Sequence, residues 1–287
     1  MRDSFYGWYL KCQSEEKTLA IIPAVHQAGK KRTCSIQVIT EEESFTVAFP
    51  GKVYRKRKGT LSIGRNQFHE RGIYLAVDTK KLHMKGRLLF GELTPLKKHI
   101  MGPFAYLPFL ECSHMVWSMQ HLVSGTVFIN GEEYVFQNAR GYWEGDKGRS
   151  FPNSYMWTQS FLPEGSLTLA VADIPLGRSH FRGIIAAVHW KGKEYRMATY
   201  LGARIVEIEE GVVRIRQGKL ELEAQLMESA EQPLRAPDSG CMSRIVRESV
   251  ACKVFYRFRR DGHTLFALET DRASFEQSER KRDCETL

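Results

Sequence analysis

Residues 140–159 contain an unusual concentration of side chains that could do chemistry. Two carboxylates, Glu144 and Asp146, lie among several aromatic rings, three glycines and a proline. Ordinary connectors between strands seldom have this composition. A carboxylate beside aromatic rings is a combination suited to acid–base work on an apolar ligand. The segment is therefore the first candidate for a functional site.

Two strands must position these side chains. Tyr142, Trp143 and Glu144 end a strand-like run that begins near Glu132, and Gly145 and Gly148 then allow the chain to turn. Pro152 favours an extended Phe151, so that a new strand can start near Ser154. Side chains alternate along a strand, which places Tyr155, Trp157 and Gln159 on one face and Met156, Thr158 and Ser160 on the other.

The rest of the chain has the pattern of an all-β protein. Short strand-like runs recur from Phe5 to Glu269, and Asn130-Gly131 between two of them is the strongest local signal for a hairpin. We expect two lipocalin-like β-barrel or sandwich lobes with very little helix, divided as residues 1–135 and 136–287. The lobe boundary could lie anywhere between about Gly125 and Tyr142.

Local features give further expectations. Residues 93–100 could form one or two helical turns, and residues 102–109, rich in Pro and aromatics, should cross between the barrel parts. Glu111–Met119 and Gly125–Ile129 are expected as separate runs. Asp173 should end a strand just before Pro175, and the charged residues after about Ala273 should fray.

Composition limits the classes of function. The chain has 287 residues and a formal net charge of +9, concentrated in short basic clusters: Lys30–Arg32, Arg55–Lys58, Arg257 with Arg259 and Arg260, and Arg280–Arg282. Solvated loops are the first interpretation of these clusters, and peripheral contact with an anionic membrane is the second. No nucleic-acid-binding motif accompanies the charge. The amino-terminal residues do not resemble a signal peptide and no apolar run could span a bilayer, so we expect a cytoplasmic protein.

The sequence gives no sign of a metal or phosphate site. Its six cysteines are scattered without a Cys-x-x-Cys pair, so we expect reduced thiols and neither zinc nor a redox motif. The phosphate-binding glycine loop, the Gly-x-Ser-x-Gly elbow and His-Glu-x-x-His are also missing.

A family resemblance rests on four landmarks in order. The central motif, Tyr-x-Glu-x-x-x-Gly-x-x-Phe-Pro-x-x-Tyr/Trp-x-Trp-x-Gln, is similar to that of the tocopherol cyclase family, whose members have a lipocalin-like double barrel. The other landmarks are Phe5–Lys11, Asn130–Phe136, and Leu220–Ala224 followed by Pro233–Pro237. The chain departs from the family pattern at Tyr6, where an acid is usual, and at Lys147 and Tyr155, where tryptophan is usual.

The resemblance implies a cofactor-free cyclisation of a prenylated quinol, in which a proton is added to an alkene and the phenol oxygen closes on the cation. Glu144 matches the acid of the family motif. Aromatic faces can stabilise the cation. The remaining roles are assigned as follows: Trp143, Tyr155 and Trp157 to the cation, Gln159 or Asp173 to orienting the phenol, His114 to accepting its proton, and Phe151 and Trp8 to further substrate contacts.

Each assignment has a structural alternative. Glu144 could pair with Arg140 or Lys147, and Trp143 and Trp157 could simply fill a core. His114 could be a hydrogen-bonded structural histidine, and Asp173 could form a turn. A non-catalytic carrier of a hydrophobic ligand on the same scaffold therefore remains the alternative to an enzyme.

Overall fold

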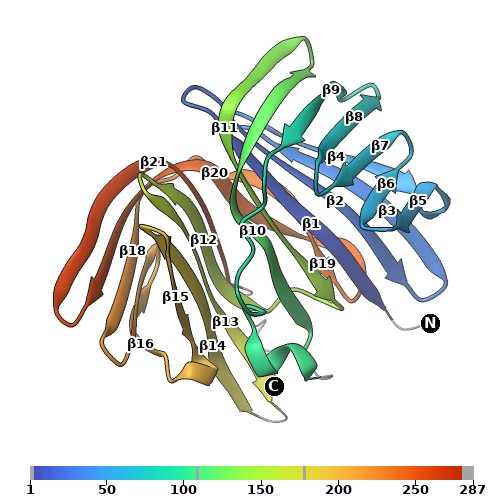
Figure 1. Ribbon diagram of the computed structural model, residues 1–287. Coiled ribbons are helices and arrows are strands. Elements are labelled where there is room, and N and C mark those ends of the chain that lie inside the picture. The colour runs from blue at the N-terminus through green and yellow to red at the C-terminus, as the bar shows by residue number, and fades with distance from the viewer. Residues whose placement is uncertain (1–2, 108–109, 177–178, 280–287) are drawn as a thin grey trace.

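A computed structural model describes residues 3–107, 110–176 and 179–279 as two large antiparallel sheets (Figure 1). The first sheet contains every strand up to Gly148, and the second contains every strand from Ser154 onward. The basic cluster Arg280–Arg282 and Cys284 lie outside the described residues. The other five cysteines are free thiols.

Sheet A has eleven strands. They are β1 (Ser4–Gln13), β2 (Thr18–Ala28), β3 (Lys31–Ile39), β4 (Ser44–Pro50), β5 (Tyr54–Arg57), β6 (Thr60–Ile63), β7 (Asn66–His69), β8 (Gly72–Asp78), β9 (His83–Phe90), β10 (Cys112–Ile129) and β11 (Glu132–Gly148). Two 3₁₀ turns lie in the same half: η1 (Gly51–Val53) and η2 (Gly102–Tyr106). The strand order is β4-β3-β2-β1-β11-β10-β9-β8-β7-β6-β5.

Sheet B has ten strands. They are β12 (Ser154–Leu162), β13 (Gly165–Leu176), β14 (Ser179–Trp190), β15 (Lys193–Ala198), β16 (Arg204–Glu209), β17 (Val212–Gln217), β18 (Leu220–Glu228), β19 (Gln232–Asp238), β20 (Cys241–Arg260) and β21 (His263–Glu279). A third 3₁₀ turn, η3 (Thr199–Leu201), joins β15 to β16. The order is β15-β14-β13-β12-β21-β20-β18-β17-β16, and β19 pairs only with β20.

Both sheets follow the same path. In each sheet the first four strands pair in sequence order from the first strand to one edge, and a 3₁₀ turn follows the fourth. The last strand of the sheet pairs with the other side of the first strand. Apart from the break at η1 or η3 and the step from β18 to β19, strands that follow one another in sequence pair with one another, as in an up-and-down barrel with its seam at the 3₁₀ turn. The expected all-β architecture of two lipocalin-like lobes with very little helix is confirmed.

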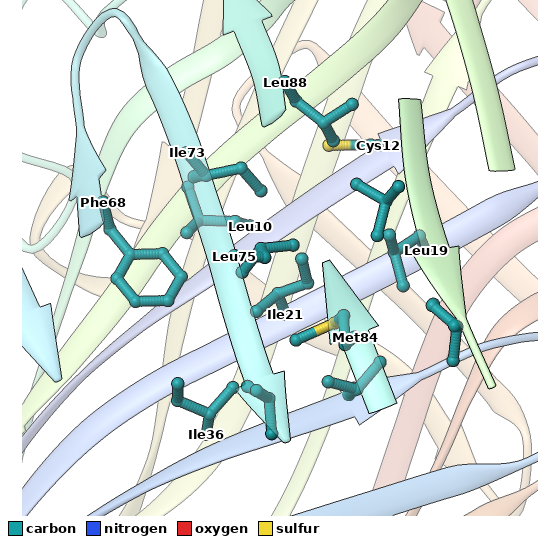
Figure 2. Packing of buried hydrophobic residues seen from close by; sticks show 14 of the residues in the cluster. Leu10, Cys12, Leu19, Ile21, Ile36, Phe68, Ile73, Leu75, Met84 and Leu88 are labelled. Atoms are coloured by element: carbon teal, nitrogen blue, oxygen red, sulfur yellow. The ribbon is translucent and has the colours of Figure 1, made fainter. Parts of the chain in front are cut away.

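Each sheet curves around its own core. In the lobe formed by sheet A, which we call lobe A, the inward side chains of β1–β3 meet those of β6–β9. Figure 2 shows Leu10, Ile21 and Ile36 packed with Phe68 and Leu75. Lobe B has an equivalent core that includes Val254, Tyr256 and Phe258. A third apolar cluster lies between the sheets and contains Tyr9, Tyr142 and Trp157. The outward faces of the two lobes are therefore partly buried against each other.

The hairpin at Asn130-Gly131 is confirmed. Both residues have positive φ, 50° and 94°, which the type I′ turn between β10 and β11 requires. The predicted alternation along β12 is also confirmed, because Met156 lies in the core of lobe B while Tyr155 and Trp157 face sheet A. The alternation of side chains along β12 therefore determines which residues of the central motif face the space between the lobes.

Several local expectations are wrong. Residues 93–100 form no helical turn, and residues 112–129 form one long bulged strand rather than two runs. The segment that contains η2 connects β9 to β10 within sheet A, so the crossing to sheet B occurs instead between β11 and β12. Residues 108–109 are outside the description.

The carboxyl end of the chain also differs from expectation. Asp173 lies inside β13 rather than at its end, opposite Arg182. Residues 274–279 do not fray, since Ser274, Phe275 and Glu276 are buried in β21, and the charged residues after Glu279 lie outside the described part of the chain. The predicted division between residues 135 and 136 falls within β11, and it stays a prediction about folding units. No helix in the described part of the chain has the length and hydropathy to cross a bilayer.

Candidate active site between the two sheets

A cavity of about 200 Å³ lies between the outward faces of the two sheets. This is far more than the roughly 10–15 Å³ that a single water needs. Most of its lining is apolar, and eight aromatic residues contribute: Phe5, Trp8, Tyr9, Phe104, Phe151, Tyr155, Trp157 and Phe181. Such a lining suits a hydrophobic ligand.

Small residues on strands of both sheets leave space for the cavity. Gly7 and Ala24 line the sheet A wall, and Ala170 and Ala172 line the sheet B wall. Large rings neighbour each of these positions, such as Tyr155, which lies opposite Ala172 across β12 and β13. The cavity therefore exists because small and large side chains alternate on the two outward faces.

Glu144 is the centre of the sheet A wall. Its carboxylate oxygen Oε2 accepts hydrogen bonds from the Tyr142 hydroxyl, from Trp157 Nε1 at 3.2 Å and from His114 Nε2 at 3.1 Å. The residue is buried and lines the cavity. Three donors therefore hold this oxygen in a fixed position.

His114 bridges two carboxylates. Its Nε2 contacts Glu144, and its Nδ1 lies 3.0 Å from Oδ1 of Asp146. Burial would lower the pKa of this ring, but the charges of Glu144 and Asp146 and their hydrogen bonds outweigh burial and raise the pKa well above its usual range. Both ring nitrogens can donate only in the imidazolium form. The sheet A wall thus holds a cation between two anions.

The sheet B wall has a second pair of carboxyl groups. Glu248 and Glu276 lie opposite each other on β20 and β21, and both line the cavity. The Tyr9 hydroxyl donates to Oε1 of Glu248 at 2.5 Å, and the Tyr155 hydroxyl donates to Oε1 of Glu276. Burial raises the pKa of Glu248 well above its usual range and that of Glu276 to about 7. This pair is suited to holding a proton.

Most of the residues predicted for the site come together. Glu144, His114, Trp8, Phe151, Tyr155 and Trp157 all line the cavity. Glu144 has none of the ion pairs suggested as an alternative, because Arg140 donates to the carbonyl oxygens of Leu162 and Pro163 and Lys147 is exposed. Of the other positions that depart from the family pattern, Tyr155 donates a hydrogen bond to Glu276, and Tyr6 accepts one from Trp8 Nε1.

Three predicted residues lie elsewhere. Trp143 packs in the core of lobe A, where its ring is 4.8 Å from that of Trp8. Gln159 is fully buried without a hydrogen-bond partner among the described residues, and it does not line the cavity. Asp173 pairs with Arg182 at 3.4 Å at the edge of a different hollow. Their proposed substrate roles have no support from this geometry.

Sequence reasoning missed Tyr9, Tyr142, Glu248 and Glu276. One local signal was present for Glu248, which interrupts an otherwise apolar alternation from Val246 to Cys252. Glu276 gave none, because it stands in a charged segment that reads as a tail. Among the described residues, no group of three or more His, Cys, Asp and Glu side chains is arranged to hold a metal ion.

Known proteins share parts of this sequence and its fold. A probable chloroplastic tocopherol cyclase from Oryza sativa subsp. japonica is 28% identical over 120 residues, which are 39% of this chain and 26% of that protein. The chain thus matches about a quarter of the length of that relative.

Two solved structures share the fold at low identity. The structure of CghA with Sch210972 has a TM-score of 0.60 at 10% identity and covers 96% of this chain and 89% of its own. Kievitone hydratase from Nectria haematococca has a TM-score of 0.56 at 10% identity, covering 97% and 90%. These likenesses extend over both lobes.

A family model described as tocopherol cyclase-like matches residues 65–277. That range includes His114, Glu144, Glu248 and Glu276, and therefore most of the polar groups of the cavity. By this match over most of its length, the chain belongs to the tocopherol cyclase-like family.

Proposed function

We propose that this protein catalyses an acid-initiated cyclisation or isomerisation of a prenylated quinol or related terpenoid lipid, without a cofactor. One observation carries the proposal: buried carboxyl groups from both sheets converge on a cavity that is otherwise apolar and aromatic. A carrier of a hydrophobic ligand has no need of such groups, because burying a carboxyl group costs free energy. The name of the rice relative supports the same class of reaction.

The chemistry needs an acid, a dry cavity and a stabilised cation. An alkene is a weak base, so the acid must remain protonated away from water. Proton addition leaves a tertiary cation, which the faces of Tyr9, Tyr155 and Trp157 can stabilise. Attack by the phenol oxygen then closes the ring and releases the phenol proton. Substrate and product are isomers, so no other reactant is consumed.

The resemblance implies that Glu144 delivers the proton and that His114 accepts the phenol proton. In this proposal Glu144 serves the last step instead, because His114 already lies between two carboxylates. Three donors occupy Oε2 of Glu144, while Oε1 has no hydrogen-bond partner among the described residues. That free oxygen can accept the phenol proton, and the imidazolium of His114 fixes the carboxylate in place. Glu144 is therefore required for turnover in this proposal.

The test combines lipid analysis with isotope labelling. Purified protein is incubated with a lipid extract of its host, in H₂O and in D₂O, and the lipids are separated and analysed by mass spectrometry. We expect a product of unchanged mass and altered retention in H₂O, which carries one deuterium on carbon in D₂O. Glu144→Gln should abolish turnover and leave ligand affinity nearly unchanged, whereas Glu164→Gln, at an exposed ion pair with Lys191, should change neither.

A lipid that co-purifies but is never converted, by either variant or by the wild type, would refute the enzyme and favour the carrier.

A cytoplasmic location and contact with an anionic membrane remain predictions. The exposed residues Lys30–Arg32 and Arg55–Arg57 are the candidates for that contact. Co-sedimentation with vesicles of anionic and of neutral lipid tests the membrane prediction, and equal binding to both would contradict it.

A further inference from the structure

The two glutamates that face each other across the cavity occupy equivalent places in the two lobes. β1 and β11 are the first and last strands of lobe A, and Tyr9 lies opposite Glu144 in their register. β12 and β21 are the first and last strands of lobe B, and Trp157 lies opposite Glu276. Each lobe thus supplies one aromatic residue and one glutamate to the cavity from matching positions.

The two glutamates differ in their hydrogen bonds. Glu144 accepts three donors, one of them a cation. Glu276 accepts one, the Tyr155 hydroxyl on Oε1, and no described residue donates to its Oε2. Glu276 forms no ion pair among the described residues, since the nearby Arg244 donates to the carbonyl oxygens of Pro152 and Asn153 and to the Ser278 hydroxyl. A carboxyl group with one donor and no ion pair loses less by keeping its proton. Equivalent positions therefore carry carboxyl groups with different hydrogen-bond surroundings.

We propose that Glu276 is the proton donor of the reaction, and that Glu144 is the acceptor on the opposite wall. This inference rests on the proposed function. The O–H bond of Glu276 breaks as a new C–H bond forms from the alkene electron pair, which leaves a carbocation and the Glu276 carboxylate. The phenol oxygen then bonds to the cation and its proton passes to Oε1 of Glu144. Glu144 releases that proton to solvent and solvent returns one to Glu276, so that both groups regain their starting states.

The surroundings of Glu276 support a donor near neutral pH. Charged and titratable groups face it from four strands: Tyr9 on β1, Glu144 and Asp146 on β11, Tyr155 on β12, and Arg244 and Glu248 on β20. Burial raises its pKa to about 7, the Tyr155 hydrogen bond opposes this shift, and the charge of Asp146 adds to it. A general acid works best when its pKa is close to the working pH. Burial also raises the pKa of Glu248, its neighbour across the strands, well above its usual range.

Glu276→Gln tests the assignment. Glutamine is neutral like the protonated acid, so the variant should fold, bind the lipid with wild-type affinity and lose about 10²–10⁴-fold in kcat. In the wild type, kcat should fall as pH rises through about 7. Glu269→Gln, on the exposed part of the same strand, is the matched control and should behave as the wild type.

A second measurement does not depend on turnover. The infrared C=O stretching band of a protonated carboxyl group should be present in the wild type at pH 6, weaken as pH rises through about 7, and be weaker in Glu276→Gln. A Glu276→Gln variant with at least a tenth of the wild-type kcat overturns the donor role. So does a Glu248→Gln variant that loses the pH-sensitive band and turnover while Glu276→Gln keeps both.

The two proposals fail in different ways. If the wild type converts no lipid, the proposed function fails and the donor role falls with it, whatever the infrared spectrum shows. If the wild type is active but insensitive to Glu276→Gln, only the donor role fails.

Discussion

Replacing His114 with glutamine should strongly destabilise the folded protein near pH 6.5. The ring lies between Glu144 and Asp146, and the three side chains are only 12%, 6% and 22% exposed. Without the imidazolium, two carboxylates face each other in a partly dry site with no cation between them. Removing one partner of a buried ionic group usually costs more than the group contributes as a whole.

The size of the effect follows from the two distances. Ion pairs at 3.1 and 3.0 Å are each worth about 5 kcal/mol at an effective dielectric constant of about 20. Desolvation of three charged groups offsets much of this, and broken buried pairs typically cost about 3–5 kcal/mol. At roughly 2–4 °C per kcal/mol, the melting temperature should fall by about 6–20 °C.

The pH dependence identifies the cause. The pKa of His114 is raised on folding, so its contribution is complete below the ordinary histidine pKa of about 6.5 and is lost as pH rises through the raised value. The gap between wild type and His114→Gln should therefore be largest near pH 6.5. Above that it should shrink by about 1.4 kcal/mol per pH unit.

Thermal unfolding from pH 6 to 9, followed by circular dichroism, measures this gap. The control is His83→Gln: His83 is 2.7 Å from Asp78, but the pair is 65% and 88% exposed, so its loss should cost less than about 0.5 kcal/mol. A His114→Gln penalty below about 1 kcal/mol, or one that is constant from pH 6.5 to 9, would refute the account of this site as an ionic cluster.

Three further changes test other parts of the structure. Ala172→Trp should fill the cavity and weaken binding of a lipophilic fluorescent probe at least about tenfold without loss of fold, and unchanged binding would place the ligand elsewhere. Lys11 is fully buried with its pKa lowered to about 7 by burial, so wild-type stability should rise from pH 7 towards 10.5 by up to about 5 kcal/mol. Lys11→Met should remove that rise. Denaturant titrations at several pH values measure it, and an equal increase in the free energy of unfolding with pH in both proteins would contradict the prediction. Gly145→Ala would bring a Cβ within 2.3 Å of the Gly7 carbonyl oxygen and should lower the free energy of unfolding by about 1–3 kcal/mol in the same titrations. A variant as stable as the wild type would show that β1 and β11 can move apart without cost.

Strand periodicity was enough to predict much of the fold and one wall of the site. Tyr155 and Trp157 could be assigned to one face because side chains alternate along β12, and that face did meet the cavity. The family resemblance directed attention to Glu144. Local patterns therefore predicted whatever depends on residues that are near in sequence.

The other wall depends on residues that are far apart. Tyr9 and Glu248 are separated by 239 positions, and only the packing of one sheet on the other brings them together. Glu276 seemed to belong to a charged tail, because nothing nearby shows that Tyr155 covers it. Asp173 was predicted at a strand end, as a substrate-orienting residue or a turn former, because its partner Arg182 becomes a neighbour only through the pairing of β13 with β14.

The chain passes from one sheet to the other once, in the few residues between Gly148 and Ser154. Every other contact across the cavity is non-covalent, including the Tyr9–Glu248 and Trp157–Glu144 hydrogen bonds. A protein cut in this segment would consist of two polypeptides, each holding one of the two glutamates proposed to act in the reaction. We expect its specific activity to decline on dilution, whereas that of the intact chain should not. The short connection acts as a tether that sets the effective concentration of one half for the other.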